Sequence, residues 1–318
     1  MKKAISILLA AALTAAALTG CSKSSGSASS GNTPLVLNEV AHSIFYAPQY
    51  AAIELGYFDE EGLDVTLVNG GGADKVMTAL VSGEADIGFM GSEASVYTYA
   101  NGEADYAVNF AQLTQRAGNF LVGREPEPDF QWENLKGKKV LGGRAGGMPQ
   151  MVFEYILKKN GIDPKADLTM DQSIEFGLTA AAFTSDQSDY TVEFEPFATG
   201  LELEGNGYVV ASLGTDSGYV PYTAYCAKKS YLAMHPDLIQ RFTSALQKGM
   251  NYVNSHTAEE IAKTIQPQFS DTPLENITKI VKRYQDQDTW KENLIFERSS
   301  FELLENILEE AGELQTRV

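Results

Sequence analysis

The sequence predicts an α/β fold built as two lobes. Short apolar runs alternate with helical patterns of about ten residues from Pro34 to about Leu113, and a second unit of the same kind begins near Phe120. Such alternation is typical of a parallel sheet with helices on its faces. Beyond Ala224 the pattern is almost entirely helical, so we expect these helices to cover sheets formed earlier in the chain, those of the first lobe.

The first unit contains three predicted strands and three predicted helices. The helices end at Gly56, at Gly83 and at Asn101-Gly102, because these residues accept the left-handed conformation of a helix end. We expect the strands at residues 35–37, 65–68 and 86–90, and the helices at residues 47–55, 73–81 and 92–100.

The second unit repeats the alternation, and its clearest element is a helix over residues 148–160. Its apolar residues Met148, Met151, Val152, Tyr155 and Ile156 fall on one helical face. The other elements are expected as strands at residues 138–141, 168–170, 190–192 and 208–212, and as a helix at residues 174–183.

Two helices stand out in the last third of the chain. Pro236 begins an apolar stripe typical of an amphipathic helix. Ser299-Ser300-Phe301-Glu302 indicates a capping box for the last helix. The predicted division is lobe 1 at residues 34–116 and 226–318 and lobe 2 at residues 117–225, with crossings near residues 115–123 and 217–227.

The first twenty-one residues predict where the protein works. Lys2 and Lys3 precede an apolar run that ends at Leu18, which is typical of a secretory signal peptide over residues 1–20 and too short to span a membrane. Leu18-Thr19-Gly20-Cys21 resembles the lipobox of bacterial lipoproteins, in which the cysteine is lipidated. The Ser/Gly-rich residues 21–33 then form a flexible tether. A plain signal peptide, or a buried helix with an incidental cysteine, is the alternative.

Composition limits the partners. The formal net charge of −18 disfavours nucleic acid and anionic membrane surfaces, although a cleft can still be locally positive. With Cys21 lipidated, Cys226 is the only other cysteine, so no disulfide framework is possible. We expect a monomer that needs no metal or organic cofactor, held at the membrane through the lipid on Cys21.

Five short motifs occur in a fixed order along the chain. They are Tyr46-Ala47-Pro48-Gln49-Tyr50-Ala51-Ala52, Glu54-Leu55-Gly56-Tyr57-Phe58, Glu61-Gly62-Leu63-Asp64-Val65, Leu80-Val81-Ser82-Gly83-Glu84-Ala85-Asp86-Ile87-Gly88 and Asn134-Leu135-Lys136-Gly137-Lys138-Lys139-Val140. In this order they resemble the solute-binding proteins of ABC importers for nitrate, sulfonates, taurine and thiamine-pyrimidine precursors. The resemblance covers the chain from about Leu35 to the C-terminal helices. It implies a periplasmic-binding-protein-like fold of type II, whose cleft closes on a small molecule and presents it to a membrane permease and its ATPase.

Two strand-to-helix loops are candidate ligand sites. Gly91-Ser92-Glu93 opens one helix, where free backbone N–H groups favour a bound acceptor; an ordinary helix cap is the alternative. The loop at residues 142–147 opens the helix that begins at Met148, and its glycines, Gly146 and Gly147 among them, let the backbone approach a ligand. In that loop Arg144 is either a ligand clamp or a solvated side chain.

Six further side chains are weaker candidates. Glu195 precedes Pro196 in a Glu-Pro pair that the resembling family also carries, and the resemblance implies that such a carboxylate pairs with an aminated ligand; a solvated charge is the alternative. Gln112 and Arg116 flank the first crossing, where Arg116 binds a carboxylate or sulfonate or forms an interlobe salt bridge. For the rings of His42, Tyr46 and Tyr222, stacking on a planar ligand and core packing are both open.

An enzyme is the main alternative function. The three histidines, His42, His235 and His256, are widely spaced and form no metal-binding pattern, and no Gly-x-Ser-x-Gly motif is present. The resemblance extends to a eukaryotic enzyme of thiamine-pyrimidine synthesis with this fold, which a lipobox disfavours. A sensor or adhesin lipoprotein is a third possibility. We therefore expect a lipid-anchored binding protein whose ligand is an aminated heterocycle or a sulfonate-like or taurine-like zwitterion.

Overall fold

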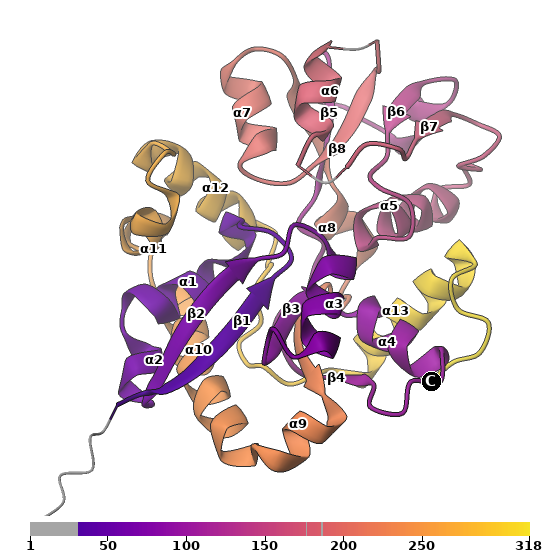
Figure 1. Ribbon diagram of the computed structural model, residues 1–318. Helices are drawn as coiled ribbons and strands as arrows, with labels where there is room; N and C mark the ends of the chain where they lie inside the picture. Colours follow the sequence, from indigo (N-terminus) through magenta and orange to yellow (C-terminus); the bar gives the residue numbers. More distant parts are fainter. Residues whose placement is uncertain (1–30, 176, 186) are drawn as a thin grey trace, which may run out of the picture. The chain divides into compact units, whose positions relative to one another are not determined.

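The computed structural model describes residues 31–318 apart from residues 176 and 186. The predicted signal peptide, Cys21 and most of the predicted tether lie outside the described residues. Residues 32–318 form one compact unit that contains two five-stranded sheets, each flanked by helices (Figure 1). The α/β fold of two lobes is therefore confirmed. We call the part around the first sheet lobe 1 and the part around the second sheet lobe 2.

The sheet of lobe 1 has the strand order β2-β1-β3-β10-β4. β1 is parallel to β2 and β3, whereas β10 is antiparallel to β3 and β4. Leu35 and Leu37 of β1 are fully buried, as expected for an inner strand. The strands are β1 (Thr33–Glu39), β2 (Leu63–Asn69), β3 (Ile87–Gly91), β4 (Ala107–Thr114) and β10 (Thr223–Lys228).

The sheet of lobe 2 repeats this plan with the order β7-β6-β8-β5-β9. β6 is parallel to β7 and β8, and β5 is antiparallel to β8 and β9. Each lobe thus has three parallel strands whose order reverses around its first strand. The strands are β5 (Phe120–Gly123), β6 (Lys139–Leu141), β7 (Thr169–Asp171), β8 (Tyr190–Glu193) and β9 (Tyr208–Ser212).

The helices of lobe 1 include both early and late parts of the chain. α10 and α11 pack against α1, and α11 also packs against α12. The early helices are η1 (Ile44–Tyr46), α1 (Ala47–Glu54), α2 (Tyr57–Glu60), α3 (Ala73–Ser82) and α4 (Glu93–Ala100). The late ones are α9 (Lys229–Met234), α10 (Pro236–Ser255), α11 (Ala258–Ile265), η3 (Gln266–Phe269), α12 (Leu274–Asp286) and α13 (Arg298–Ala311).

The helices of lobe 2 are fewer and shorter. α5 is the exception: it presents a buried apolar face that includes Met151, Val152 and Ile156, as the periodicity of the sequence predicts. The helices of lobe 2 are η2 (Trp132–Leu135), α5 (Met148–Lys159), α6 (Thr179–Ser185), α7 (Phe197–Leu203) and α8 (Leu213–Ser217).

The two segments that join the lobes run beside each other. The backbone N–H of Leu213 donates to the carbonyl of Asn119 (3.1 Å), and that of Val220 donates to the carbonyl of Gln115 (3.0 Å). Gly118 lies against the ring of Phe45, where an added Cβ would stand 2.7 Å from a ring carbon. The two connecting segments are therefore hydrogen-bonded to each other and tightly packed, and the second of them includes the helix α8.

The structure corrects three predictions about single elements. The helical region expected after Ala224 is preceded by the strand β10, an inner strand of the first sheet. The helix predicted at residues 174–183 begins later, at Thr179. The predicted capping box at Ser299 does not form, because α13 begins at Arg298 with no side-chain cap. The last helix also contacts the second lobe, since α13 packs against α5.

Candidate functional site

A cavity of about 400 Å³ lies between the two sheets. Its lining comes from the loops that follow β1, β3, β6 and β8, which supply Val40, Glu93, Arg144 and Phe194 among others. These loops leave the carboxyl ends of parallel strands at the points where the strand order reverses. Open α/β sheets bind ligands there, so each lobe contributes its expected binding edge to one cavity.

Two glycines beside the cavity have different structural reasons, close approach of a side chain at Gly91 and a positive φ at Gly146. A Cβ on Gly91 would overlap the Glu93 carboxylate, so glycine here lets that side chain fold back over the start of α4. Gly146, in the loop before α5, has φ of 79°, a conformation that favours glycine. Both strand-to-helix loops predicted as ligand sites therefore line the cavity, with the N-termini of α4 and α5 beside it.

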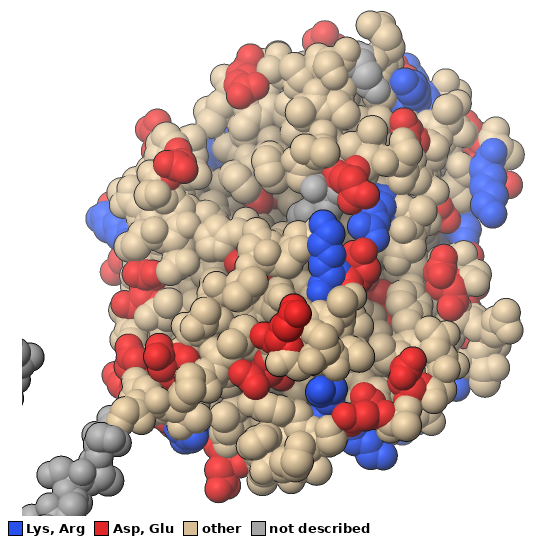
Figure 2. Space-filling model, in the orientation of Figure 1, with Lys and Arg blue, Asp and Glu red and all other residues tan. Residues whose placement is uncertain are grey.

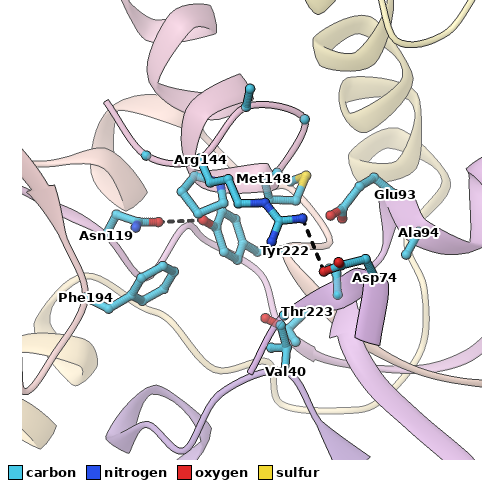
Figure 3. Close-up of a pocket in the computed structure, with 18 of the residues that line it drawn as sticks. Val40, Asp74, Glu93, Ala94, Asn119, Arg144, Met148, Phe194, Tyr222 and Thr223 are labelled. Carbon is cyan, nitrogen blue, oxygen red and sulfur yellow. Dashed lines mark hydrogen bonds and ion pairs between the residues drawn. The ribbon is translucent and has the colours of Figure 1, made fainter. Parts of the chain in front are cut away.

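Glu93 is the most unusual polar group of the cavity. Its side chain is buried, and Oε2 has no hydrogen-bond partner among the described residues. Burial raises the pKa of this carboxyl to about 8, and hydrogen bonds from the backbone N–H groups of Glu93 and of Met148 in lobe 2 oppose the shift. The carboxyl therefore contacts the other lobe and still presents one free oxygen (Figure 3).

Glu193 at the end of β8 is the second buried carboxyl of the lining. It accepts hydrogen bonds from the hydroxyls of Thr179 (2.9 Å) and Thr191 (2.6 Å). Burial raises the pKa of Glu193 to about 7, and the two hydroxyls lower it. A second desolvated acid therefore lies on the lobe 2 side of the cavity.

Aromatic rings and one amide complete the wall around the connecting segments. The hydroxyl of Tyr222 donates to Oδ1 of Asn119 (2.5 Å), and Nδ2 of Asn119 is buried without a partner among the described residues (Figure 3). The rings of Phe194 and Tyr222 lie 6.2 Å apart, and Tyr46 also lines the cavity. The wall is thus largely apolar, with a few polar atoms that fix orientation, as in most small-molecule sites.

Arg144 joins the lobes at the edge of the cavity. Its guanidinium lies 3.2 Å from the carboxylate of Asp74 in lobe 1 (Figure 3). It also lies 3.3 Å from the carboxylate of Glu175 in lobe 2. All three side chains are partly exposed. The face of the molecule in Figure 2 has a hollow near its centre, with acidic and basic side chains beside it. Arg144 therefore bridges two carboxylates across the lobes.

The structure brings seven of the twelve sequence-predicted residues together and leaves five outside the cavity lining. The seven in the lining are Tyr46, Glu93, Arg144, Gly146, Gly147, Met148 and Tyr222. Of the others, Ser92 donates its hydroxyl to the carbonyl of Pro221, and Arg116 donates to the carbonyl of Gly214. Gln112 is buried and donates to the carbonyl of Thr114. A ligand role for these residues stays a prediction.

His42 and Glu195 are the remaining two, and each lies in a polar network of its own. His42 contacts the Glu39 carboxylate (2.8 Å) and the carbonyl of Gln268 (2.8 Å). The carboxylate of Glu195 accepts hydrogen bonds from Arg283 and from the backbone N–H of Thr199. Their predicted ligand contacts stay predictions, because the described lining does not include them.

Sequence reasoning did not single out Asp74, Asn119 or Glu193 as site residues. A signal existed for Glu193, since it ends a parallel strand and strand ends face the ligand in open α/β sheets. No pattern marks Asn119, which lies in a connecting segment. Among residues 31–318 other than 176 and 186, no group of His, Cys, Asp and Glu side chains is placed to hold a metal ion.

Comparison with known proteins decides the family. The profile described as "NMT1/THI5 like" matches residues 44–260, more than half of the chain. The chain belongs to the NMT1/THI5-like family. The resemblance identified from the motifs is thereby confirmed.

One protein of known sequence is closely similar to this chain. The protein YtlA of Bacillus subtilis strain 168, a candidate binding protein by its name, is 45% identical over 90% of this chain and 86% of its own length. A more distant relative is the 4-amino-5-hydroxymethyl-2-methylpyrimidine phosphate synthase THI11 of Saccharomyces cerevisiae. It is 24% identical over 66% of this chain and 63% of its own length.

Solved structures agree on the fold. The periplasmic aliphatic sulphonate binding protein SsuA of Escherichia coli superposes with a TM-score of 0.70 at 17% identity, covering 90% of this chain and 95% of SsuA. At this identity the likeness concerns the fold, which is that of the periplasmic binding proteins. In the described part of the chain, no helix combines the length and apolarity needed to cross a membrane.

Proposed function

We propose that this protein is the substrate-binding lipoprotein of an ABC importer, which captures a small molecule by hinge closure and delivers it to a membrane permease and its ATPase. The observation that carries the proposal is the cavity lined by strand-end loops of both lobes. A ligand there contacts both lobes at once only in the closed form. This difference in contacts is what shifts an open–closed equilibrium.

The relatives support the transport role. YtlA carries the description of a binding protein and shares most of its length with this chain, and SsuA is a periplasmic binding protein of the same fold. The two connecting segments lie side by side and form one junction about which we propose that the lobes rotate.

The extracytoplasmic location rests on residues 1–33. The predicted signal peptide ending at Gly20, the predicted lipidation of Cys21 and the predicted Ser/Gly-rich tether support a location of the folded part outside the cytoplasmic membrane. Metabolic labelling with an azide-bearing fatty acid tests this point. Label should enter the wild-type protein and be absent from Cys21→Ala, and equal labelling of both would contradict the anchor.

We infer a ligand site at Tyr46, Glu93, Arg144, Gly146, Gly147, Met148 and Tyr222, together with Asn119, Glu193 and Phe194. Two ligand classes follow from the sequence: an aminated heterocycle such as a thiamine-pyrimidine precursor, and a sulfonate-like or taurine-like zwitterion. The cavity volume of about 400 Å³ suits a molecule of either class.

Small-angle X-ray scattering of residues 32–318 tests hinge closure. The native ligand is first recovered by mass spectrometry from protein purified under non-denaturing conditions and then added back to stripped protein. We expect a smaller radius of gyration and a higher melting temperature with the ligand. Identical scattering with and without it would contradict the proposal.

A synthase is the competing candidate, because more distant relatives are named 4-amino-5-hydroxymethyl-2-methylpyrimidine phosphate synthases. A turnover assay separates the two. A binding protein returns its ligand unchanged after prolonged incubation, whereas an enzyme accumulates product. The identity of 45% to YtlA, against 24% to THI11, favours the binding protein.

A further inference from the structure

The charges around the cavity are unequal. Among the described lining residues the ionisable groups of Asp, Glu, Lys and Arg belong to Asp74, Glu93, Glu193 and Arg144. Arg144 is engaged by Asp74 and by Glu175, which lies outside the lining. Glu93 and Glu193 are therefore two buried acids that no cationic side chain of the lining neutralises.

One oxygen of the Glu93 carboxyl also has no hydrogen-bond donor among the described residues. Glu93 lines the cavity, and this oxygen, Oε2, is buried (Figure 3). A buried acceptor without a hydrogen bond is unfavourable, and a buried carboxylate without a positive partner more so. A ligand that brings a charged N–H group satisfies both deficits at once, whereas an ionised sulfonate brings no donor to Oε2.

We propose that the cavity takes a small, flat organic base, whose protonated nitrogen donates to Oε2 of Glu93 while Glu193 adds negative potential from lobe 2. This inference rests on the proposed binding function and selects the basic class over sulfonates and other oxyanions. The rings of Tyr46, Phe194 and Tyr222 supply flat apolar surfaces for the rest of the molecule. The unpartnered Nδ2 of Asn119 offers a donor to a ligand acceptor elsewhere on the ring.

Binding of a cationic ligand changes the protonation of Glu93. The groups electrostatically coupled to Glu93 are Tyr46, Tyr97, Tyr222 and Cys226, and burial raises the pKa of each, so all four are neutral near pH 7. Glu193 titrates in the same range as Glu93, and the Asp74–Arg144 pair lies at the edge of the cavity. An empty site therefore holds a proton on Glu93 that a cationic ligand must displace.

Benzamidine and benzenesulfonate form a matched pair of probes, since they share one ring and carry head groups of opposite charge. Calorimetry on residues 32–318 stripped of ligand should detect benzamidine and not benzenesulfonate. The benzamidine affinity should rise up to about tenfold per pH unit from pH 6 to 7, because one proton is released on binding. A sulfonate that needs protonated Glu93 would show the opposite slope.

Three substitutions test whether Glu93 is responsible for benzamidine binding and for its pH dependence. Glu93→Gln keeps the shape and removes the charge, and it should weaken benzamidine binding at least tenfold and flatten the pH slope. Glu193→Gln should weaken it severalfold and keep most of the slope. Glu305→Gln is the matched control: its carboxylate is also buried, but it accepts from the backbone N–H of Val318, outside the described lining. It should leave the affinity unchanged.

The outcomes separate this inference from the proposed function. Tight binding of benzenesulfonate or taurine with a closing of the lobes, or benzamidine binding unaffected by Glu93→Gln, overturns the basic ligand class and leaves the transport role standing. Failure of both benzamidine and 4-aminopyrimidine to bind also overturns the ligand class. Catalytic consumption of the native ligand, or its binding without closure, overturns the proposed function itself.

Discussion

Two buried carboxylates, Glu93 and Glu195, show how a binding site differs from a structural ion pair. Glu195 is fully buried, and both of its oxygens accept hydrogen bonds, from Arg283 and from the hydroxyl and backbone N–H of Thr199. Glu93 is also buried and lines the cavity, but one of its oxygens has no partner among the described residues. Burial of an acid alone is therefore no sign of function, whereas burial with unmet hydrogen bonding is.

The largest effect on stability is expected for a substitution of Glu195. The side chain of Arg283 is only 20% exposed, and Glu195 is its fully buried partner. Replacing Glu195 by Ala leaves Arg283 with Glu202 as its remaining ion-pair partner. We expect the free energy of unfolding to fall by about 3–5 kcal/mol. Urea denaturation measures it, with Glu302→Ala on the exposed face of α13 as the control. A loss below about 1 kcal/mol would show that the pair is not structural.

Replacing Glu93 by Gln should stabilise the ligand-free protein at neutral pH, whereas replacing Glu195 destabilises it. Its folded pKa of about 8 lies above the ordinary 4.5, so its stabilising contribution is full below pH 4.5 and is lost as the pH rises to about 8. Since one pKa unit corresponds to about 1.4 kcal/mol, Glu93→Gln should be more stable than wild type by about 3 kcal/mol at pH 7. The two proteins should converge near pH 4, and a constant difference across this range would contradict the assignment.

A smaller effect on stability is expected in the hydrogen-bond network around His42. Its ring nitrogens face the Glu39 carboxylate and the carbonyl of Gln268, both acceptors, so the ring is held in the doubly protonated form and Glu39 raises the pKa of His42. The stabilisation is full below about pH 6.5 and is lost as the pH rises through the raised folded value. His42→Ala should cost about 1 kcal/mol at pH 6 and less at pH 9 in thermal unfolding.

The smallest effect is expected at the exposed bridge between the lobes. Asp74→Asn removes one partner of Arg144 and should weaken ligand affinity by less than about fivefold, since exposed ion pairs contribute below about 1 kcal/mol. Stopped-flow dissociation at low and high salt detects it. Lys263→Gln, which removes an exposed pair on α11, should have no effect on dissociation. A larger loss for Asp74→Asn would mean that the bridge controls closure.

Prediction from the sequence succeeded where the signal is local. The apolar face of α5 and the glycines of the loops after β3 and β6 were identified because helical periodicity and backbone freedom depend on neighbouring residues. It failed at β10, whose pairing partners β3 and β4 lie more than a hundred residues earlier in the chain. It also ranked Glu195 with Glu93, because the position of Arg283, 88 residues away, is invisible in a linear pattern.

The sequence by itself determined the α/β class, the alternation of strands and helices, and the two glycine-containing loops at strand ends. Each of these follows from the spacing of apolar residues and from backbone conformations that glycine allows. Only the tertiary structure decided which acid pairs with an arginine and which keeps a free oxygen. That outcome depends on which donors folding brings within hydrogen-bonding distance, and those donors come from the other lobe and from late helices.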